Sequence, residues 1–180
     1  MPSGIANMAR RNGARSSEVT LHASSALLDI HQRAHQNLAA LLEHCRALPG
    51  ADLNREQEGF GYASVRLQLH HAIGAERYWV GVLQGQMLVD DDDPAFPTID
   101  SLEILRVRVA GVTEDYLRGA AADELNKPRP MTTWGGKERH LVPARIVMRV
   151  VTHLYHHQGQ VVAMCRLLGK PAGGLDYPLA

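Results

Sequence analysis

The 180-residue sequence lacks several features that would assign it to a familiar class. Its 19 basic and 19 acidic residues cancel, so no net charge attracts nucleic acid or an anionic membrane surface. Only two cysteines are present, Cys45 and Cys165, which are too few for a secreted disulfide framework and fit a reduced, cytoplasmic setting. No apolar run approaches the roughly 18 residues that a membrane-spanning helix needs. We therefore expect a cytoplasmic protein that binds neither membrane nor nucleic acid.

The N-terminal residues differ in composition from the rest of the chain. Residues 1–18 are small, polar and basic, and they show no apolar periodicity. Their arginines are not followed by the apolar stretch of a secretory signal. We predict a flexible basic N-terminal arm over residues 1–18 and a single domain over residues 19–180, a length at which one hydrophobic core suffices.

Apolar residues recur at alternating steps of three and four in four segments, which is typical of helices packed on a core. Asp100 and Glu103, near the start of the third segment, have the spacing of a capping box. Residues 123–142 lack periodicity, and no segment alternates apolar and polar residues as a half-buried strand does. The prediction is an all-α fold, an up-down four-helix bundle, with helices over residues 20–48, 62–86, about 98–119 and 143–168.

Three of the ten histidines interrupt the apolar seams of these helices. Residues four apart lie one above the other on a helix, so His153 and His157 can present two imidazoles to one point, and His71 can add a third from the second helix. Three imidazoles suit a divalent transition metal rather than magnesium or calcium; zinc and nickel are the first candidates, with iron or manganese as alternatives. Three protein ligands leave an open position, as in catalytic zinc sites.

The histidine pattern also has a purely structural interpretation. A His-x-x-x-His pair occurs by chance in a histidine-rich chain, but three imidazoles buried without a metal would leave ring nitrogens unsatisfied. His31 also lies on an apolar seam, that of the first helix. Three roles are open to it: a fourth metal ligand, a partner of a ligand, or a buried polar group. The remaining histidines are predicted at flanks, boundaries or the surface: His22, His35, His44, His70, His140 and His156.

Two further residues are candidates for catalytic roles. Gln160 lies one turn after the last of the three histidines and can hydrogen-bond a ligand or water. Arg149 lies one turn before His153 and can bind a substrate carboxylate, although a surface salt bridge is the alternative. Glu76 is predicted to form an ion pair between helices, and Tyr78 and Trp79 are predicted to serve as core and boundary packing.

Two motifs resemble those of the DinB/YfiT-like superfamily of metal-binding four-helix proteins. Residues 71–79 (HAIGAERYW) place a histidine eight residues before a tryptophan, and residues 153–160 (HLYHHQGQ) match a His-x-x-x-His-x-Gly-Gln signature. Many members have arginine at the position of Gln158. Trp134-Gly135 and the C-terminal residues 168–177 are similar as well, and the resemblance covers roughly residues 20–180.

The resemblance implies a four-helix bundle, often a homodimer, with a divalent metal bound by His71, His153 and His157. Relatives include S-transferases, conjugate hydrolases and an isomerase that use low-molecular-weight thiols. A thiol bound to a metal loses its proton and becomes a nucleophile at neutral pH. We therefore hypothesise a metal-dependent enzyme that acts on a small-molecule substrate with such a thiol. The alternatives are a metal-dependent hydrolase without a thiol and a non-enzymatic metal-binding dimer in a stress response.

Features of the site distinguish these hypotheses. A cavity above the metal position, lined by Arg149 or similar polar groups, would favour an enzyme. A fourth protein ligand such as His31 would close the site and count against one. The sequence contains no Gly-x-Ser-x-Gly motif, phosphate-binding glycine loop or His-Glu-x-x-His motif, so no familiar protein nucleophile is expected.

Overall fold

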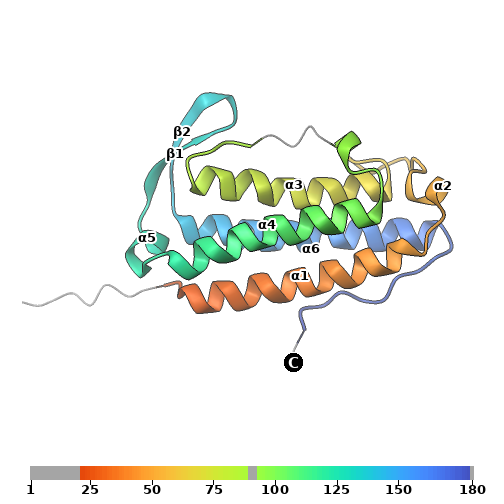
Figure 1. Ribbon diagram of the computed structural model, residues 1–180, viewed down its shortest axis with the longest axis horizontal. Coiled ribbons are helices and arrows are strands. Elements are labelled where there is room, and N and C mark those ends of the chain that lie inside the picture. The colour runs from red at the N-terminus through yellow and green to blue at the C-terminus, as the bar shows by residue number, and fades with distance from the viewer. Residues whose placement is uncertain (1–20, 89–92, 179–180) are drawn as a thin grey trace, which may run out of the picture.

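Four long helices lie side by side along the molecule (Figure 1). The computed structural model describes residues 21–88 and 93–178. The predicted helical segments are confirmed and are slightly shorter than expected, and the chain is mostly helical, as the all-α prediction requires. The long helices are α1 (Ser24–Arg46), α3 (Val65–Leu83), α4 (Ile99–Gly119) and α6 (Pro143–Leu167).

The long helices do not alternate strictly in direction (Figure 1). α1 and α3 run in opposite directions, whereas α3 and α4 run the same way. The short helix η1 (Asp93–Ala95) follows α3 in the chain but lies beside its beginning, where Asp93 accepts a 3.1 Å hydrogen bond from Arg66. The ring of Phe96 is likewise 5.6 Å from that of His70. The up-down order is therefore wrong for this middle pair of helices.

The starts of the helices follow from their capping residues. The Ser64 hydroxyl accepts from the Leu67 backbone N–H at 3.3 Å at the start of α3. α4 begins with a capping box, but its members are Thr98 and Ser101, each of whose side chains accepts from the other's backbone N–H. The box predicted at Asp100 and Glu103 is wrong, because threonine already provides the cap two residues earlier.

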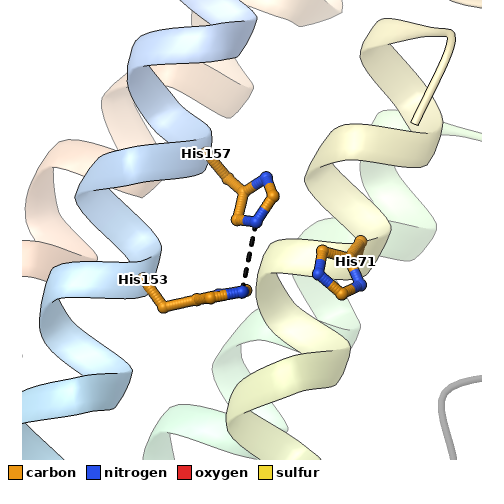
Figure 2. Close-up of side chains that lie close together, drawn as sticks. All are labelled: His71, His153 and His157. Atoms are coloured by element: carbon orange, nitrogen blue, oxygen red, sulfur yellow. Dashed lines mark hydrogen bonds between the residues drawn. The ribbon is translucent and has the colours of Figure 1, made fainter. Parts of the chain in front are cut away.

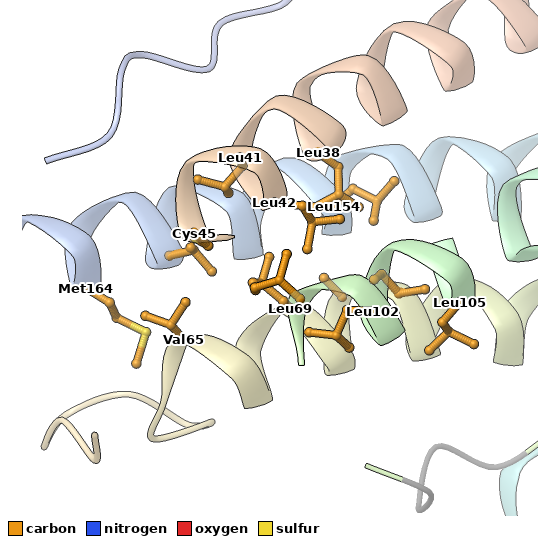
Figure 3. Close-up of a cluster of buried hydrophobic side chains, with 14 of the residues drawn as sticks. Leu38, Leu41, Leu42, Cys45, Val65, Leu69, Leu102, Leu105, Leu154 and Met164 are labelled. Atoms are coloured by element: carbon orange, nitrogen blue, oxygen red, sulfur yellow. The ribbon is translucent and has the colours of Figure 1, made fainter. Parts of the chain in front are cut away.

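The core lies between the long helices, and leucine is its commonest residue (Figure 3). The alternating steps of three and four residues predict a seam on α1, and every residue of it is buried: Leu27, His31, Ala34, Leu38, Leu41, Cys45 and Leu48. The same steps predict Val112 on the seam of α4 and Leu167 at the end of the seam of α6, but these side chains are 37% and 70% exposed, so both predictions are wrong. Buried Thr113 and Leu117 take the inward positions on α4 instead.

A β-hairpin stands where the sequence suggested irregular structure. Strands β1 (Arg129–Thr133) and β2 (Lys137–Leu141) pair antiparallel around the turn η2 (Trp134–Gly136). Gly135 and Gly136 have φ of 71° and 70°, values that favour glycine. The expectation that the chain has no strand is thus wrong. Short helices α2 (Gly50–Leu53) and α5 (Ala122–Asn126) were also not predicted.

The hairpin is anchored to the end of α3. The Trp134 backbone N–H donates to the Tyr78 hydroxyl at 2.8 Å, and the Arg129 guanidinium donates to the Leu83 carbonyl at 2.6 Å. These contacts hold the hairpin against α3, and residues of the hairpin, α3 and α6 together line one cavity. Within the described ranges, no helix is long and apolar enough to cross a membrane. The predicted arm, residues 1–18, lies outside the described residues, so the division into an arm and a domain stays a prediction.

Candidate metal centre

Helices α3 and α6 bring the three seam histidines to one point (Figure 2). One ligand nitrogen from each of His71, His153 and His157 lies within 4.8 Å of the others. The Nε2 atoms of His153 and His157 are 3.1 Å apart. The ring centroid of His71 is 5.2 Å from that of His153 and 4.7 Å from that of His157. The spacing argument therefore selected residues that meet in space, while their binding of a metal stays a prediction.

The surroundings keep the α6 imidazoles neutral. Burial lowers the pKa of His153 to about 4, and the neighbouring His157 and His71 add to this effect. Burial also lowers the pKa of His157 to about 4, with His71 and His156 contributing. Neutral imidazole is the form that binds metal, because it carries a free lone pair. At neutral pH both rings are therefore in the state that a metal requires.

Gln68 orients His157, and sequence reasoning did not identify it. The Nδ1–H of His157 donates to the Gln68 Oε1 at 2.7 Å, and both residues are buried. Because an amide oxygen only accepts, the Nδ1 atom carries the proton and the Nε2 lone pair faces the other histidines. A hydrogen bond of this kind commonly fixes the tautomer of a metal-ligating histidine. The sequence could have indicated Gln68 by its position, because it lies three residues before His71 and so on the same face of α3.

Tyr62 restricts the third imidazole. Its ring stacks on that of His71 with centroids 3.8 Å apart and an angle of 18° between the planes. The three donors together form a carboxylate-free nitrogen set, which fits a transition metal and disfavours magnesium or calcium. A metal would also remove the need for His153 and His157 to share a proton between two close Nε2 atoms.

A cavity of about 460 Å³ lies beside the three histidines, within the range of roughly 300–1,000 Å³ that small-molecule sites occupy. His71 and His153 belong to its wall, and so does Arg149, whose Cζ is 5.3 Å from the centroid of the Trp79 ring. The prediction of Tyr78 and Trp79 as packing residues missed that both line the cavity. The wall consists of His71, Ala75, Tyr78, Trp79, Thr133, Trp134, Lys137, Arg139, Arg149 and His153.

Gln160 is not part of that wall. Its Nε2 lies 3.2 Å from the Nε2 of His156, an exposed residue. The structure thus brings Arg149 to the cavity beside the three histidines but leaves Gln160 outside it. A catalytic role for either residue stays a prediction.

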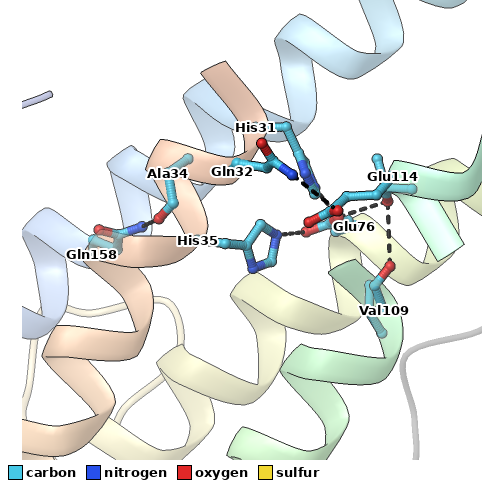
Figure 4. Close-up of polar contacts among 9 residues, drawn as sticks. His31, Gln32, Ala34, His35, Glu76, Val109, Glu114 and Gln158 are labelled. Atoms are coloured by element: carbon cyan, nitrogen blue, oxygen red, sulfur yellow. Dashed lines mark hydrogen bonds and ion pairs between the residues drawn. The ribbon is translucent and has the colours of Figure 1, made fainter. Parts of the chain in front are cut away.

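A second histidine cluster lies between α1, α3 and α4 (Figure 4). The carboxylate of Glu76 is 2.7 Å from the Nε2 of His31, from the Nε2 of His35 and from the hydroxyl of Thr113. Each of these residues is at most 4% exposed. Burial alone would raise the pKa of Glu76, but the charges and hydrogen bonds of His35 and His31 outweigh it and lower that pKa.

The second cluster settles the position of His31. It is a buried polar group bound to Glu76, which confirms the ion pair predicted between helices. His35 shares that carboxylate and is 4% exposed, so its predicted surface or boundary position is wrong. The donor atoms of His31, His35 and Glu76 also lie within 4.8 Å of one another, but the carboxylate already has three hydrogen-bonding neighbours. We interpret this cluster as structural.

The comparison with known proteins assigns this mostly helical chain to a family. A family model described as the DinB family matches residues 23–180. The chain therefore belongs to the DinB family, which confirms the resemblance found in the sequence. None of the curated proteins matches the chain.

Proposed function

We propose that this DinB-family protein is a metal-dependent enzyme built on a four-helix bundle. His71, His153 and His157 would hold one divalent transition metal, with zinc and nickel as first candidates and iron or manganese as alternatives. The observation that carries the proposal is the meeting of three imidazoles at the edge of a 460 Å³ cavity. Three protein ligands leave a position for a further ligand, and the cavity gives a small molecule access to it.

The side chains of the cavity wall bear on the choice between a thiol and water as the nucleophile. Among the described residues, the wall contains no cysteine, serine or carboxylate that could attack a substrate or act as a general base. A metal bound here would lower the pKa of a thiol or a water at its open position. A thiol needs only the loss of its proton, because thiolate is already a strong nucleophile. We therefore favour a low-molecular-weight thiol cosubstrate over hydrolysis by water.

The protein's own residues have separate roles in this scheme. Gln68 holds the His157 ring with its Nε2 directed toward the other histidines, and Tyr62 holds the plane of the His71 ring. Arg149 at the cavity wall would bind an anionic part of the substrate. The aromatic side chains beside it would exclude water from the reacting groups.

The expected homodimer remains a proposal. Helix α4 exposes Ile104 by 61% and Val107 by 55%, one turn apart on its outer face. Burying such side chains is favourable in a symmetric interface between two copies. Light scattering coupled to size exclusion would show a dimer that Ile104→Glu converts to a monomer.

The first test is metal content, measured by elemental mass spectrometry on untagged protein. We expect about one metal ion per chain, lost in His71→Ala and His157→Ala and retained in the matched variant of the exposed neighbour, His156→Ala. An absence of metal even after incubation with zinc or nickel would refute the proposal.

The second test concerns the thiol. Metal-loaded protein is given an electrophilic substrate, such as a chlorodinitrobenzene, with and without a small thiol such as N-acetylcysteine. Turnover that requires both the metal and the thiol would support the proposal. Substrate loss that requires the metal alone would support the hydrolase instead, and a metal-loaded protein with neither activity would support the non-enzymatic alternative.

A further inference from the structure

We infer that the cavity selects a small organic acid: a carboxylate or similar anionic group attached to a flat, apolar body. This inference rests on the proposed function, because it takes the cavity beside the three histidines as the substrate site. It adds the charge and shape of the substrate, which neither the family nor the metal centre specifies.

The register of the hairpin directs positive charge toward the cavity. Thr133 pairs with Lys137 and Met131 pairs with Arg139, and paired residues of an antiparallel ladder share a face. Thr133 and Met131 are buried against the helices, so Lys137 and Arg139 lie on that inner face. Glu138 lies between them in the strand and therefore on the opposite face. The hairpin thus turns its two cations inward and its carboxylate outward.

These two cations join Arg149 of α6 in the cavity wall, and the wall contains no acidic residue. Within the part of the chain that the structure describes, no ion pair neutralises any of the three. Like charges held together repel one another, and an anion that enters the cavity relieves this repulsion. Guanidinium groups also offer paired donors that match a carboxylate. The charge of the wall therefore favours an anionic ligand.

The aromatic side chains define the rest of the ligand. Tyr78 and Trp79 both line the cavity, with their rings in an edge-to-face contact at 5.1 Å. Trp134 is 65% exposed, yet its backbone is tied to the Tyr78 hydroxyl. Aromatic walls alone can also hold a cation, but Lys137 and Arg149 would repel one. Flat apolar surface remains as the match for these rings.

Tryptophan fluorescence offers a direct test, because both tryptophans of the chain, Trp79 and Trp134, line the cavity. The probes are a matched set: cinnamate, its neutral amide and cationic cinnamylamine. They are titrated into the full chain with and without metal, since a carboxylate can also bind an open metal position directly. We expect cinnamate to bind about tenfold more tightly than the amide in both forms, as hydrogen bonds to charged groups allow. Cinnamylamine should bind more weakly than the amide.

Variants identify the source of the preference. Arg149→Gln and the double variant Lys137→Gln/Arg139→Gln should each reduce the ratio of the cinnamate and cinnamamide affinities. All three side chains are exposed, so the fold should be retained. Arg166→Gln, at an exposed arginine of α6 outside the cavity wall, is the matched control and should leave the ratio unchanged.

The outcomes separate this inference from the function on which it rests. Equal affinity for acid and amide, no binding of either, or a preference that all the variants retain would overturn it. Metal analysis of the same samples keeps the two questions apart. A protein that holds metal but does not prefer the acid keeps the proposed function and loses the inference. An Arg149-dependent preference in a protein that binds no metal refutes the metal centre instead.

Discussion

Two His-x-x-x-His pairs in this protein have opposite surroundings. His31 and His35 on α1 face the carboxylate of Glu76, whereas His153 and His157 on α6 face the imidazole of His71. Both facing residues belong to α3, where a separation of five residues puts them on different sides of the helix. The spacing of a histidine pair therefore does not determine its role. The residue presented by the neighbouring helix does.

The difference is one of hydrogen-bond complementarity. A buried carboxylate accepts from two imidazoles and from the Thr113 hydroxyl, so the Glu76 carboxylate of the first cluster has its hydrogen-bond partners without a metal. The three imidazoles of the second cluster share no carboxylate, and one ring nitrogen of each lies within 4.8 Å of the others beside an open cavity. A divalent cation is the natural complement of that arrangement. Four predictions test this contrast, from the largest expected effect to the smallest.

The largest effect should be on metal content. Removing one imidazole from the α6 pair, as in His153→Ala, should abolish metal binding, because two nitrogens alone hold a divalent ion weakly. Removing one from the α1 pair, as in His35→Gln, should leave about one metal ion per folded chain. Elemental analysis after gel filtration gives both values. Metal lost from the α1 variant and kept by the α6 variant would reverse our assignment of the two clusters.

The next largest effect should be on stability. Glu76→Ala removes the acceptor that His31, His35 and Thr113 share, and breaking a buried ion-pair network by removing one partner costs roughly 3–5 kcal/mol. The free energy of unfolding of metal-free protein, measured in urea, should fall by about that amount. Glu114→Ala, a partly exposed carboxylate of α4, provides the control. A loss no larger than that of the control would show that the network contributes little.

A smaller effect is expected from Gln68→Leu. The substitution removes the acceptor for the His157 Nδ1–H while leaving the three nitrogens in place, and loss of such a partner typically weakens metal affinity about 10- to 100-fold. Competition with a chromophoric chelator measures the change. The matched control is Gln84→Ala at the exposed end of α3. Unchanged affinity in Gln68→Leu would mean that the His157 ring is held by packing alone.

The smallest effect should appear at acid pH. The pKa of Glu76 is lowered below its ordinary value of 4.5, so the folded protein binds this proton less readily than the unfolded chain. Its contribution to stability is therefore present above pH 4.5 and is lost as pH falls through the folded-state pKa. The stability difference between wild type and Glu76→Gln should shrink as pH is lowered from 4.5. A difference that grows instead would contradict the direction of the shift.

Seam periodicity predicted the helices and the three histidines because both depend on local spacing. Every residue of the α1 seam is buried, and the His153 and His157 side chains meet as i, i+4 neighbours should. Periodicity carries no information on direction, so the parallel run of α3 and α4 was missed. For the same reason the partners of Glu76 and Gln68 could not be named from the sequence, because a residue's partner depends on which helices are neighbours.

The hairpin escaped prediction for a different reason. Strand β2 begins Lys-Glu-Arg-His, four polar residues whose alternation of faces leaves no apolar signal. Its inward side chains are cations at a cavity rather than apolar residues in a core. The cations that we infer to attract an anionic ligand take the positions where apolar residues would have indicated a strand in the sequence.

The anchoring of the hairpin to the end of α3 has a consequence for how the protein could be changed. The three histidines lie on helices. The hairpin between α5 and α6 contributes four other residues to the cavity wall: Thr133, Trp134, Lys137 and Arg139. Part of the inferred ligand choice is therefore encoded in a stretch of the chain that contains none of the three histidines. We expect that a hairpin of another sequence, grafted between Asn126 and Pro143 with its tie to Tyr78 preserved, would change the ligand preference of the cavity and leave the three histidines in place.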